Sequence, residues 1–559
     1  MKHMFRMGAV GLGVAALSMA AALGGCSNDD DNNATPAEKV QNVVVIYAEN
    51  RAFDNTFGNF PGANGLGTVV DGSGKPTSAY VPQKDRDGTT VLETLPPTWG
   101  GVTAAGVSPA VSQAQSTGLA NAPYSIETGF TAASGVTLSS DTITRDLYHR
   151  FFENQMQING GKNDMFAAWA DSGGLTMGHF DTSSSKIYGL AKQYVLADNF
   201  FEGAFGGSFL NHQYLICACA PSVSADFVSN NKASVNVLGT ARNGVPQLAT
   251  NSSSPASAMD GAPSLKSGNI APLDYFGSGD GYRAVNTMQP PYQPSGNAPV
   301  DLSGSDNLYA NPSAATTLPA QTAKTIGDLL DAKKVTWKWY AGSWNDAVAD
   351  GEQDPATKRS VIYAGNSNGT SDTSHVDFQT HHHPFNYYAE FDPATHADAR
   401  SAHLKDETDL IADAKAGTLP AVSFYKPVGL YNQHEGYTNL SDGDDHIASI
   451  VSQLQASPQW KHMLIVITYD EFGGAYDHVA PPKGDLLGPG TRIPAIIISP
   501  LSKKNGTVDH TQYDTASVLR FMVSRWKLDA TQLPGLAARD AALKAAGGQP
   551  MGDLSGALQ

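Results

Sequence analysis

The sequence predicts an α/β fold built on a mostly parallel β-sheet flanked by helices. Short runs of Val, Ile and aromatic residues recur along the chain, and helical patterns separate them. Strands that alternate with helices are typical of open α/β sheets. Three of the runs are almost continuously apolar, which is the pattern of strands buried on both faces of a parallel sheet.

The elements follow one another in a simple order. The expected strands cover residues 43–47, 335–340, 421–425, 463–469 and 493–499, of which the first, fourth and fifth are the nearly continuous runs. The expected helices cover residues 144–157, 208–218, 325–332, 446–454 and 515–526. Two stretches rich in Gly, Ser, Pro, Ala and Asn, 65–135 and 221–319, predict long cap-like insertions. Loops of this length are usually functional or disordered, so we expect them to border a ligand site.

Residues 1–25 have the pattern of an export signal. Lys2 and Arg6 precede an apolar run over residues 7–23, and Leu23-Gly24-Gly25-Cys26 resembles the lipobox of bacterial lipoproteins. We therefore expect an exported protein of the cell envelope, in the periplasm or at the outer membrane, anchored to a membrane through a lipidated Cys26. The alternative is a plain secretory signal cut nearby, in which case Cys26 is not lipidated and the protein is secreted.

Three segments follow the signal. Residues 26–39 include a run of acidic residues without apolar periodicity, which predicts a flexible tether. Residues 40–530 contain all the expected strands and helices and form the main domain, and residues 531–559 are expected to be a C-terminal tail. No stretch after the signal is apolar enough to span a bilayer.

Charge and cysteine usage exclude two kinds of function. The formal net charge is −17, so the surface repels nucleic-acid backbones and no nucleic-acid partner is expected. Apart from Cys26, the cysteines are Cys217 and Cys219. Their one-residue spacing is poor for a relaxed disulfide, and two thiols are too few for a zinc-thiolate site. We therefore expect two small buried residues.

Polar side chains follow two of the expected buried strands. Glu49 and Asn50 follow the first, and Asp470 and Glu471 follow the strand at 463–469. Ligands of open α/β sheets gather at the carboxyl ends of the strands, so the two clusters can meet in space. Adjacent carboxylates repel each other unless a cation or a proton lies between them, and oxygen donors suit a divalent ion. The alternative is ordinary loop capping by these residue types.

Ser208 is the candidate nucleophile. It follows Gly206 and Gly207 and precedes an apolar run over residues 209–217. Glycines let the backbone approach a ligand closely, and a helix N-terminus attracts phosphate. A serine hydroxyl needs activation by a base or a metal, which an ion near Glu49 would supply. The alternative is that Ser208 is only the N-cap of the helix.

Histidines are the third signal. His381, His382 and His383 are consecutive, and other histidines are scattered along the chain. A lone histidine is usually a solvated or structural residue. A consecutive run could hold a metal, or could supply protonated side chains around a phosphoryl group.

Six ordered segments resemble a known family. The segments are VVVIYAENRAFDNTFG, DLYHRFFENQMQINGGKNDMF, FGGSFLNHQYL, HHHPFNYY, TYDEFGGAYDHVAPP and RIPAIIISP. The chain resembles the bacterial phosphoesterase family of respiratory-burst-inhibiting acid phosphatases and phosphocholine-preferring phospholipases C. The resemblance implies an alkaline-phosphatase-like α/β fold for the domain at 40–530, and one divalent metal ion as cofactor.

The resemblance also assigns roles by position. The residues that match metal ligands are Glu49, Asn50, Asp470 and Glu471, and Ser208 matches the metal-bound nucleophile. The histidines that match the lining of a phosphate pocket are His149, His382, His383 and His434. His446 is a further candidate by position only.

The expected activity is hydrolysis of small phosphate monoesters by an acid phosphatase. Arg6 stands alone where the phospholipase branch commonly has twin arginines, that branch commonly has a C-terminal extension, and the QINGGKND block looks more like the phosphatase branch. One alternative is a phospholipase C that acts on phosphodiesters such as phosphatidylcholine and contacts phospholipid headgroups. Another is a non-enzymatic surface lipoprotein in which the metal is a structural clamp.

Overall fold

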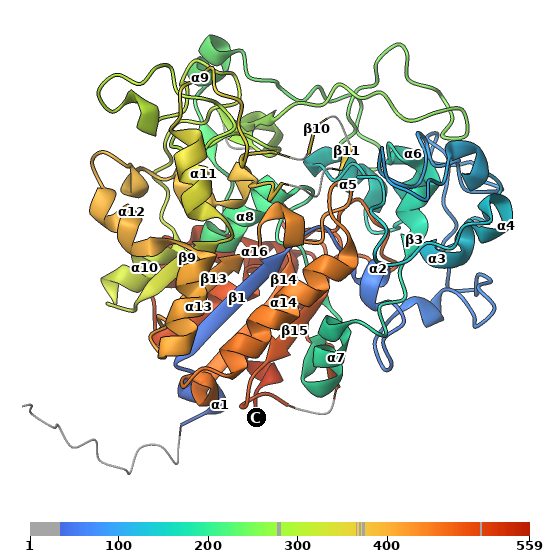
Figure 1. Cartoon of the computed structure of the whole chain (residues 1–559). Helices are drawn as coiled ribbons and strands as arrows, with labels where there is room; N and C mark the ends of the chain where they lie inside the picture. Colours follow the sequence, from blue (N-terminus) through green and yellow to red (C-terminus); the bar gives the residue numbers. More distant parts are fainter. Residues whose placement is uncertain (1–33, 277–280, 365, 368–369, 372–374, 504–505) are drawn as a thin grey trace, which may run out of the picture. The chain divides into compact units, whose positions relative to one another are not determined.

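The computed structural model describes residues 34–559 apart from 277–280, 365, 368–369, 372–374 and 504–505. Residues Pro36–Gln559 form one compact unit that holds all the elements described below (Figure 1). The predicted export signal and Cys26 lie outside the described residues. None of the helices within the described ranges has the length and apolar character needed to cross a membrane.

A mixed sheet with strand order β12-β9-β13-β1-β14-β15-β4-β16 forms the centre of this unit (Figure 1). β1 (Asn42–Ala48) lies between β13 (Val422–Lys426) and β14 (Met463–Tyr469), and both pairings are parallel. β9 (Trp337–Ala341) and β12 (Leu404–Asp406) continue the parallel part. The predicted α/β class with a mostly parallel sheet is confirmed.

The other side of the sheet changes direction. β15 (Ala495–Ile498) runs antiparallel to both β14 and β4 (Val195–Ala197), and β16 (Thr507–Asp509) is parallel to β4. Strand direction cannot be predicted from an apolar run alone. β4, β12 and β16 were not predicted, because each has three residues and no extended apolar pattern.

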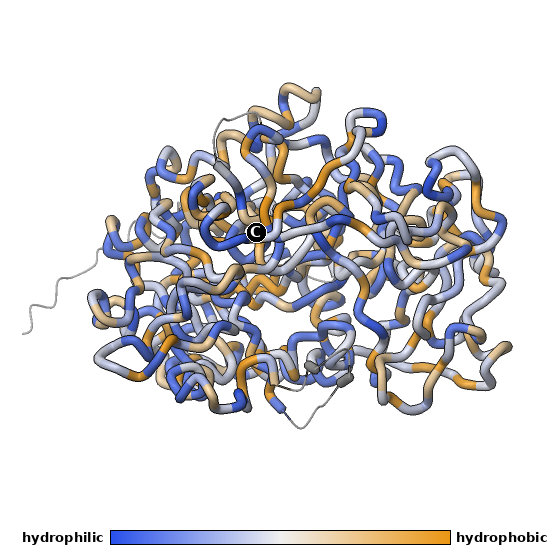
Figure 2. The backbone as a smooth tube through the Cα atoms, turned by 90° about the horizontal axis from the view of Figure 1, so that it is seen from above, coloured by the Kyte–Doolittle hydropathy of each residue, from blue (hydrophilic) through white to orange (hydrophobic). Residues whose placement is uncertain are grey.

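The core explains the continuous apolar runs. Every residue of β1, β14 and β15 is buried, as expected for strands covered on both faces. In Figure 1, α13 (Glu407–Ala416) and α14 (Leu440–Gln455) cover one face of the sheet. Figure 2 shows hydrophobic stretches gathered in the middle of the fold, with hydrophilic stretches frequent at its periphery.

Three helices agree with their predicted bounds, whereas the helix predicted at 446–454 is longer, because α14 begins at Leu440 and ends at Gln455. α8 (Ser208–Cys217), α10 (Ile326–Ala332) and α15 (Ser517–Trp526) lie close to their predicted bounds. The helix predicted at 144–157 is shorter, because α5 spans only Phe151–Ile158. The segment before it is held by other partners, since the amide of Arg145 donates to Val102 and that of Tyr148 to Asp171.

The predicted insertions and terminal segments differ in character. Residues 65–135 and 221–319 contain only short elements, such as α4 (Thr131–Ser134) and α9 (Ala225–Asn231). The predicted tether at 26–39 ends in α1 (Pro36–Lys39), which belongs to the compact unit. The segment predicted as a tail contains α16 (Pro534–Ala545), whose Leu543 is fully buried. These 29 residues at 531–559 are therefore folded.

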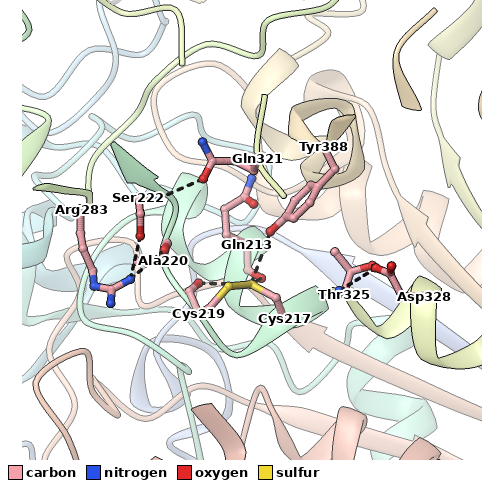
Figure 3. Close-up of a disulfide and its surroundings, with 10 residues drawn as sticks. All are labelled: Gln213, Cys217, Cys219, Ala220, Ser222, Arg283, Gln321, Thr325, Asp328 and Tyr388. Carbon is pink, nitrogen blue, oxygen red and sulfur yellow. Dashed lines mark hydrogen bonds between the residues drawn. A yellow bond between two sulfur atoms is a disulfide. The ribbon is translucent and has the colours of Figure 1, made fainter. Parts of the chain in front are cut away.

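Cys217 and Cys219 form a disulfide at the C-terminal end of α8 (Figure 3). Ala218 between them has the left-handed conformation, with φ 50°, and the two Cα atoms are 5.1 Å apart. The expectation of two unconnected buried residues was wrong, because the tight turn at the helix end brings the two sulfurs together. The Tyr388 hydroxyl lies 3.5 Å from the Cys217 sulfur and donates to it.

Candidate active site

β1 and β14 place the four predicted metal ligands side by side. Ala48 pairs with Tyr469, so Glu49 and Asp470 leave the sheet at equivalent positions. The backbone N–H of Asn50 donates to Oδ1 of Asp470 at 3.0 Å, across 420 residues of sequence. Glu49, Asn50, Asp470 and Glu471 are all 0% exposed. The two clusters therefore meet at the carboxyl edge of the sheet, as predicted.

Each of the three carboxylates has one anchored oxygen. Oε1 of Glu49 lies 2.5 Å from Nζ of Lys426 and 3.0 Å from Nε2 of His382. Oδ1 of Asp470 accepts the backbone N–H groups of Asn50 and Glu471. Oε2 of Glu471 accepts the backbone N–H of Gly473 at 2.7 Å. The three carboxylates are thus held in fixed orientations.

The second oxygen of each carboxylate is unpaired. Glu49 Oε2, Asp470 Oδ2, Glu471 Oε1 and the side-chain amide of Asn50 are buried and have no hydrogen-bond partner among the described residues. Burial, followed by the charge of Glu49, raises the pKa of Asp470 to about 7. Burial and the charge of Asp470 raise the pKa of Glu471 well above its ordinary value.

These oxygens fit a divalent cation. Buried polar atoms without partners are costly, and a cation between carboxylates removes both the missing contacts and the repulsion. Carboxylate, amide and hydroxyl oxygens are donors that hard cations such as Mg²⁺, Ca²⁺ and Mn²⁺ prefer. The residues present therefore suit the one ion that the sequence predicts.

Ser208 borders this cluster. It is the first residue of α8 and 4% exposed, and its side chain lies close enough to the Asp470 carboxylate to offset part of the rise in the pKa of that group. The N-cap is Gly207 rather than Ser208, so the capping alternative was wrong. A Cβ on Gly206, which has φ 83°, would lie 2.3 Å from the backbone of Arg150 and Phe151. The glycines therefore let this loop pack directly on the segment that carries His149.

A cavity of about 470 Å³ opens over Ser208. Four histidine side chains line it together with Ser208: His149, His381, His382 and His434. The insertion at 221–319 contributes a polar part of the wall, consisting of Ser234, Ser267, Gly268, Asn269, Asn286 and Thr287. This insertion therefore borders the site as expected. The residues that line the cavity include none from the insertion at 65–135.

His149 and His434 both face the carboxylates. Nε2 of His149 is 3.6 Å from Oε1 of Glu471, and Nε2 of His434 is 4.0 Å from Oε2 of Glu49. Nδ1 of His149 lies 2.6 Å from the carbonyl oxygen of Leu147, and Nδ1 of His434 contacts that of Glu435. An oxygen this close requires an N–H at Nδ1. In a neutral ring, Nε2 is then a hydrogen-bond acceptor.

Burial works against the positive charge expected of the histidines. Burial lowers the pKa of His149, His382 and His434, and neighbouring cationic groups lower the pKa of His382 and His434 further. A basic residue that the sequence analysis missed, Lys426, pairs with Glu49. It is the last residue of β13 and follows the predicted strand at 421–425. Glu49 was selected because it is a polar residue at the carboxyl end of a strand, and the same criterion would have selected Lys426.

The structure does not bring His383 into the cavity. Its ring packs against Trp344 and Trp339, with centroids 4.1 and 5.6 Å away. His381 lines the cavity instead, with Nδ1 2.8 Å from the hydroxyl of Tyr363. His446 is not among the residues that line the cavity. Its Nε2 lies 2.6 Å from the hydroxyl of Tyr425.

His212 was also missed as a site residue. Ligand atoms of Glu49, His212 and Asp470 lie within 4.8 Å of one another. Its Nδ1 is 2.8 Å from the carbonyl oxygen of Ser208, and its buried Nε2 has no partner in the described part of the chain. The available signal was its spacing, because residues four apart share one face of a helix.

The family assignment follows from the whole domain. The model of the Phosphoesterase family matches residues 40–529. The chain belongs to this family. Similar proteins include non-specific phospholipase C1 of Arabidopsis thaliana, 33% identical over 135 residues, which are 19% of this chain and 25% of that protein. Non-hemolytic phospholipase C of Pseudomonas aeruginosa is 30% identical over 146 residues, or 20% of this chain and 21% of that protein.

The similarity to these phospholipases is partial, and the similarity to solved structures is low. The matched part spans about a quarter or less of the length of these two phospholipases. Among solved structures, a protein in the alkaline phosphatase superfamily from Vibrio parahaemolyticus aligns with a TM-score of 0.27 at 9% identity. That alignment covers 74% of this chain and 72% of the other.

Proposed function

We propose that this member of the Phosphoesterase family hydrolyses small phosphate monoesters, with Ser208 as nucleophile and one divalent cation held by Glu49, Asn50, Asp470 and Glu471. One observation carries the proposal: Ser208 lines the histidine cavity, and its side chain lies close enough to the Asp470 carboxylate to favour the charged form of that group. A structural metal clamp would not require a hydroxyl between the ion site and a cavity.

The reaction has two steps. Oγ of Ser208 loses its proton and forms a bond to phosphorus, the bond from phosphorus to the ester oxygen breaks, and the leaving oxygen takes up that proton and departs as the alcohol. Water then attacks the phosphoserine, releases phosphate and restores Ser208. The bound cation supplies charge stabilisation of the serine oxygen. Asp470 orients the hydroxyl, and the N-terminal amides of α8 attract the phosphoryl oxygens.

The histidine tautomers favour monoesters over diesters. Nε2 of His149 and of His434 is an acceptor, because Nδ1 of each ring faces a carbonyl oxygen. A monoester monoanion carries a P–OH group that can donate to such an acceptor, whereas a diester has no proton on phosphorus oxygens. Because the second pKa of a phosphate monoester is about 6, this form prevails in acid. The proposed enzyme is therefore an acid phosphatase.

The wall of the cavity also supports a small polar leaving group. The large hydrophobic side chains that are exposed in the described part of the chain are Val81, Val91, Val237, Met259, Val300, Leu302 and Leu486. None of these described residues lines the cavity. Acyl chains would thus find none of these exposed hydrophobic side chains at the cavity, whose described apolar and aromatic lining residues are Leu147, Tyr148, Phe209 and Tyr437.

A second candidate is phospholipase C activity, which the names of the two relatives favour. The test compares p-nitrophenyl phosphate and glycerol phosphate with bis-p-nitrophenyl phosphate and phosphatidylcholine vesicles. We expect turnover of the monoesters, with an alkaline limb of the pH profile that shifts with the second pKa of each monoester. Faster turnover of phosphatidylcholine would favour the second candidate, and a limb at one pH for both monoesters would contradict the tautomer argument.

We also propose that the protein is exported and anchored through Cys26. Support comes from the sequence of residues 1–26 and from the disulfide, because disulfides persist in oxidising compartments. Cys26→Ser should move the protein from the detergent phase to the aqueous phase in a partition assay. An unchanged distribution would overturn the lipid anchor.

A further inference from the structure

We infer that Lys426 matches the charge of the site to one divalent cation and holds Glu49 with Oε2 directed at the ion. The inference rests on the proposed metal site. It assigns a positioning role to a lysine that neither the sequence motifs nor the family match selects.

Lys426 reaches Glu49 because their strands are neighbours. Tyr425 of β13 pairs with Ile46 of β1, so the residues that follow both strands lie at the same edge of the sheet. Nζ of Lys426 is 2.5 Å from Oε1 of Glu49, and the lysine is 2% exposed. It does not line the cavity over Ser208 and instead borders a small void behind it, with His382 and His383. Lys426 therefore acts through Glu49 rather than on the substrate.

The contact decides which oxygen of Glu49 is free. Oε1 accepts a hydrogen bond from Lys426 and lies 3.0 Å from Nε2 of His382, whereas the buried Oε2 is unpaired within the described residues. Asp470 and Glu471 have the same division between an anchored and a free oxygen, but backbone amides anchor theirs. Among the three described carboxylates, only Glu49 is held by a basic side chain, Lys426, rather than by backbone amides.

The charges of the cluster then match one divalent ion. Glu49, Asp470 and Glu471 carry three formal negative charges, and Lys426 reduces the total to two. The other buried cation nearby, Arg51, is paired with its own carboxylate, Glu435. Without the lysine, the same oxygens would carry three charges and would favour a trivalent ion by Coulomb attraction.

Cation selectivity of the metal-free full chain tests this inference. Calorimetric titration with Ca²⁺ and Tb³⁺, which have similar radii and different charges, gives a ratio of two dissociation constants for each variant. In Lys426→Met, the preference for Tb³⁺ over Ca²⁺ should rise at least about tenfold above that of the wild type, because one buried charge is removed. Lys426→Arg should keep the wild-type ratio, since it keeps the charge. A substitution that weakens the binding of both ions equally leaves the ratio of their dissociation constants unchanged.

Two further measurements separate the possible failures. The matched control is Lys338→Met. Lys338 belongs to the neighbouring strand β9 and pairs with Asp413 at 2.6 Å, so its loss should leave the ratio of the two dissociation constants unchanged. Lys426→Gln replaces the methionine variant if circular dichroism shows that the latter is unfolded. An unchanged ratio in the neutral variant, or an equal change in Lys426→Arg, overturns the role of Lys426. A wild type that binds neither ion overturns the metal site itself, whereas Ca²⁺ binding without phosphate release overturns only the proposed reaction.

Discussion

Ser208 contributes a hydroxyl to the site and little to the fold. Gly207 is the N-cap of α8, and its cap has no side-chain hydrogen bond, so the helix does not depend on the serine. The loop before Ser208 is instead held by its glycines and by backbone contacts. A substitution at Ser208 can therefore remove the hydroxyl with little effect on the fold. A substitution at Asp470 would also remove the contact that holds the backbone of Asn50.

Ser208→Ala should lower the turnover number at least about 100-fold, because it removes the atom that forms the covalent intermediate. The free energy of unfolding should change by less than about 1.5 kcal/mol, the typical net contribution of one hydrogen bond. Phosphate release and denaturant unfolding measure the two effects. Ser234→Ala, in the wall of the same cavity, is the control and should retain activity. Substantial turnover by a folded Ser208→Ala protein would remove the serine from the mechanism.

His478 provides a pH-dependent contribution to stability away from the active site. Its Nδ1 is 2.7 Å from Oδ2 of Asp54, which also pairs with Arg492. Burial lowers the pKa of His478, but the Asp54 carboxylate outweighs burial and the pKa is raised. Burial raises the pKa of Asp54, but His478 and Arg492 outweigh it and the pKa is lowered.

A raised histidine pKa stabilises the fold below the unfolded pKa, about 6.5, and this stability is lost as pH rises through the folded value. The lowered pKa of Asp54 stabilises the fold above its unfolded pKa, about 3.9, and that stability is lost as pH falls through the folded value. His478→Gln should therefore reduce the free energy of unfolding more at about pH 5.5 than at about pH 9. Urea denaturation at both pH values is the measurement. His510→Gln, which breaks a pair with Asp198 in which the histidine is 65% exposed, should show a smaller difference.

At the scale of elements, both ends of α8 have stabilising contacts. At its N-terminus, the fully buried Glu202 accepts backbone N–H groups from Gly206, Phe472 and Thr491, at 3.4, 3.1 and 2.9 Å. One carboxylate thus joins the loop before Ser208 to the loop that follows Glu471. At its C-terminus, the disulfide closes the last turn (Figure 3). A shift of the N-terminal end of the helix would disturb the contacts of Glu202 with two distant loops.

Gly206→Ala replaces no site residue but should reduce activity by at least about tenfold, because its Cβ would collide with the backbone at Arg150 and displace the loop before Ser208. Gly106→Ala is a matched control. Both glycines have φ 83°, but a Cβ on Gly106 would have no described neighbour within 4 Å. The control should therefore lose only about 1 kcal/mol of stability from backbone strain. Equal activity in the two variants would contradict the packing argument.

At the scale of the whole described unit, residues beyond the family match help to hold the active-site loop. The match ends at residue 529, whereas α16 begins at Pro534. Arg539 of this helix is fully buried and pairs with Asp485 and Asp514, at 2.8 and 2.6 Å. Its guanidinium also donates to the carbonyl oxygen of Gly203, shortly before the Ser208 loop.

Arg539→Met should lower the free energy of unfolding by about 3 kcal/mol or more, because it leaves two carboxylates without their buried partner. Arg520→Met breaks a pair with Asp540 in which the side chains are 12% and 31% exposed, and it should cost less. Chemical denaturation compares the two variants. Equal effects would show that the buried pairs do not stabilise this part of the molecule.

The sequence by itself determined the parts of this protein whose signals are local. A continuous apolar run predicts a buried strand, and a polar residue directly after it predicts a ligand at the edge of the sheet. For this reason β1, β14 and the residues that follow them, Glu49 and Asp470 among them, could be located without coordinates. The start of α8 at Ser208 was predicted within one residue for the same reason, because it has its own glycine and apolar pattern.

Only the tertiary structure decided the features that depend on contacts between distant segments. The direction of β15, the loss of helix before Phe151 and the folding of α16 all follow from such contacts. So does the choice among consecutive histidines, since His381 and His382 face the cavity while His383 packs against tryptophans. Lys426 lies beside Glu49 because β13 is the neighbour of β1. Strand order depends on how the whole sheet packs and not on either strand alone.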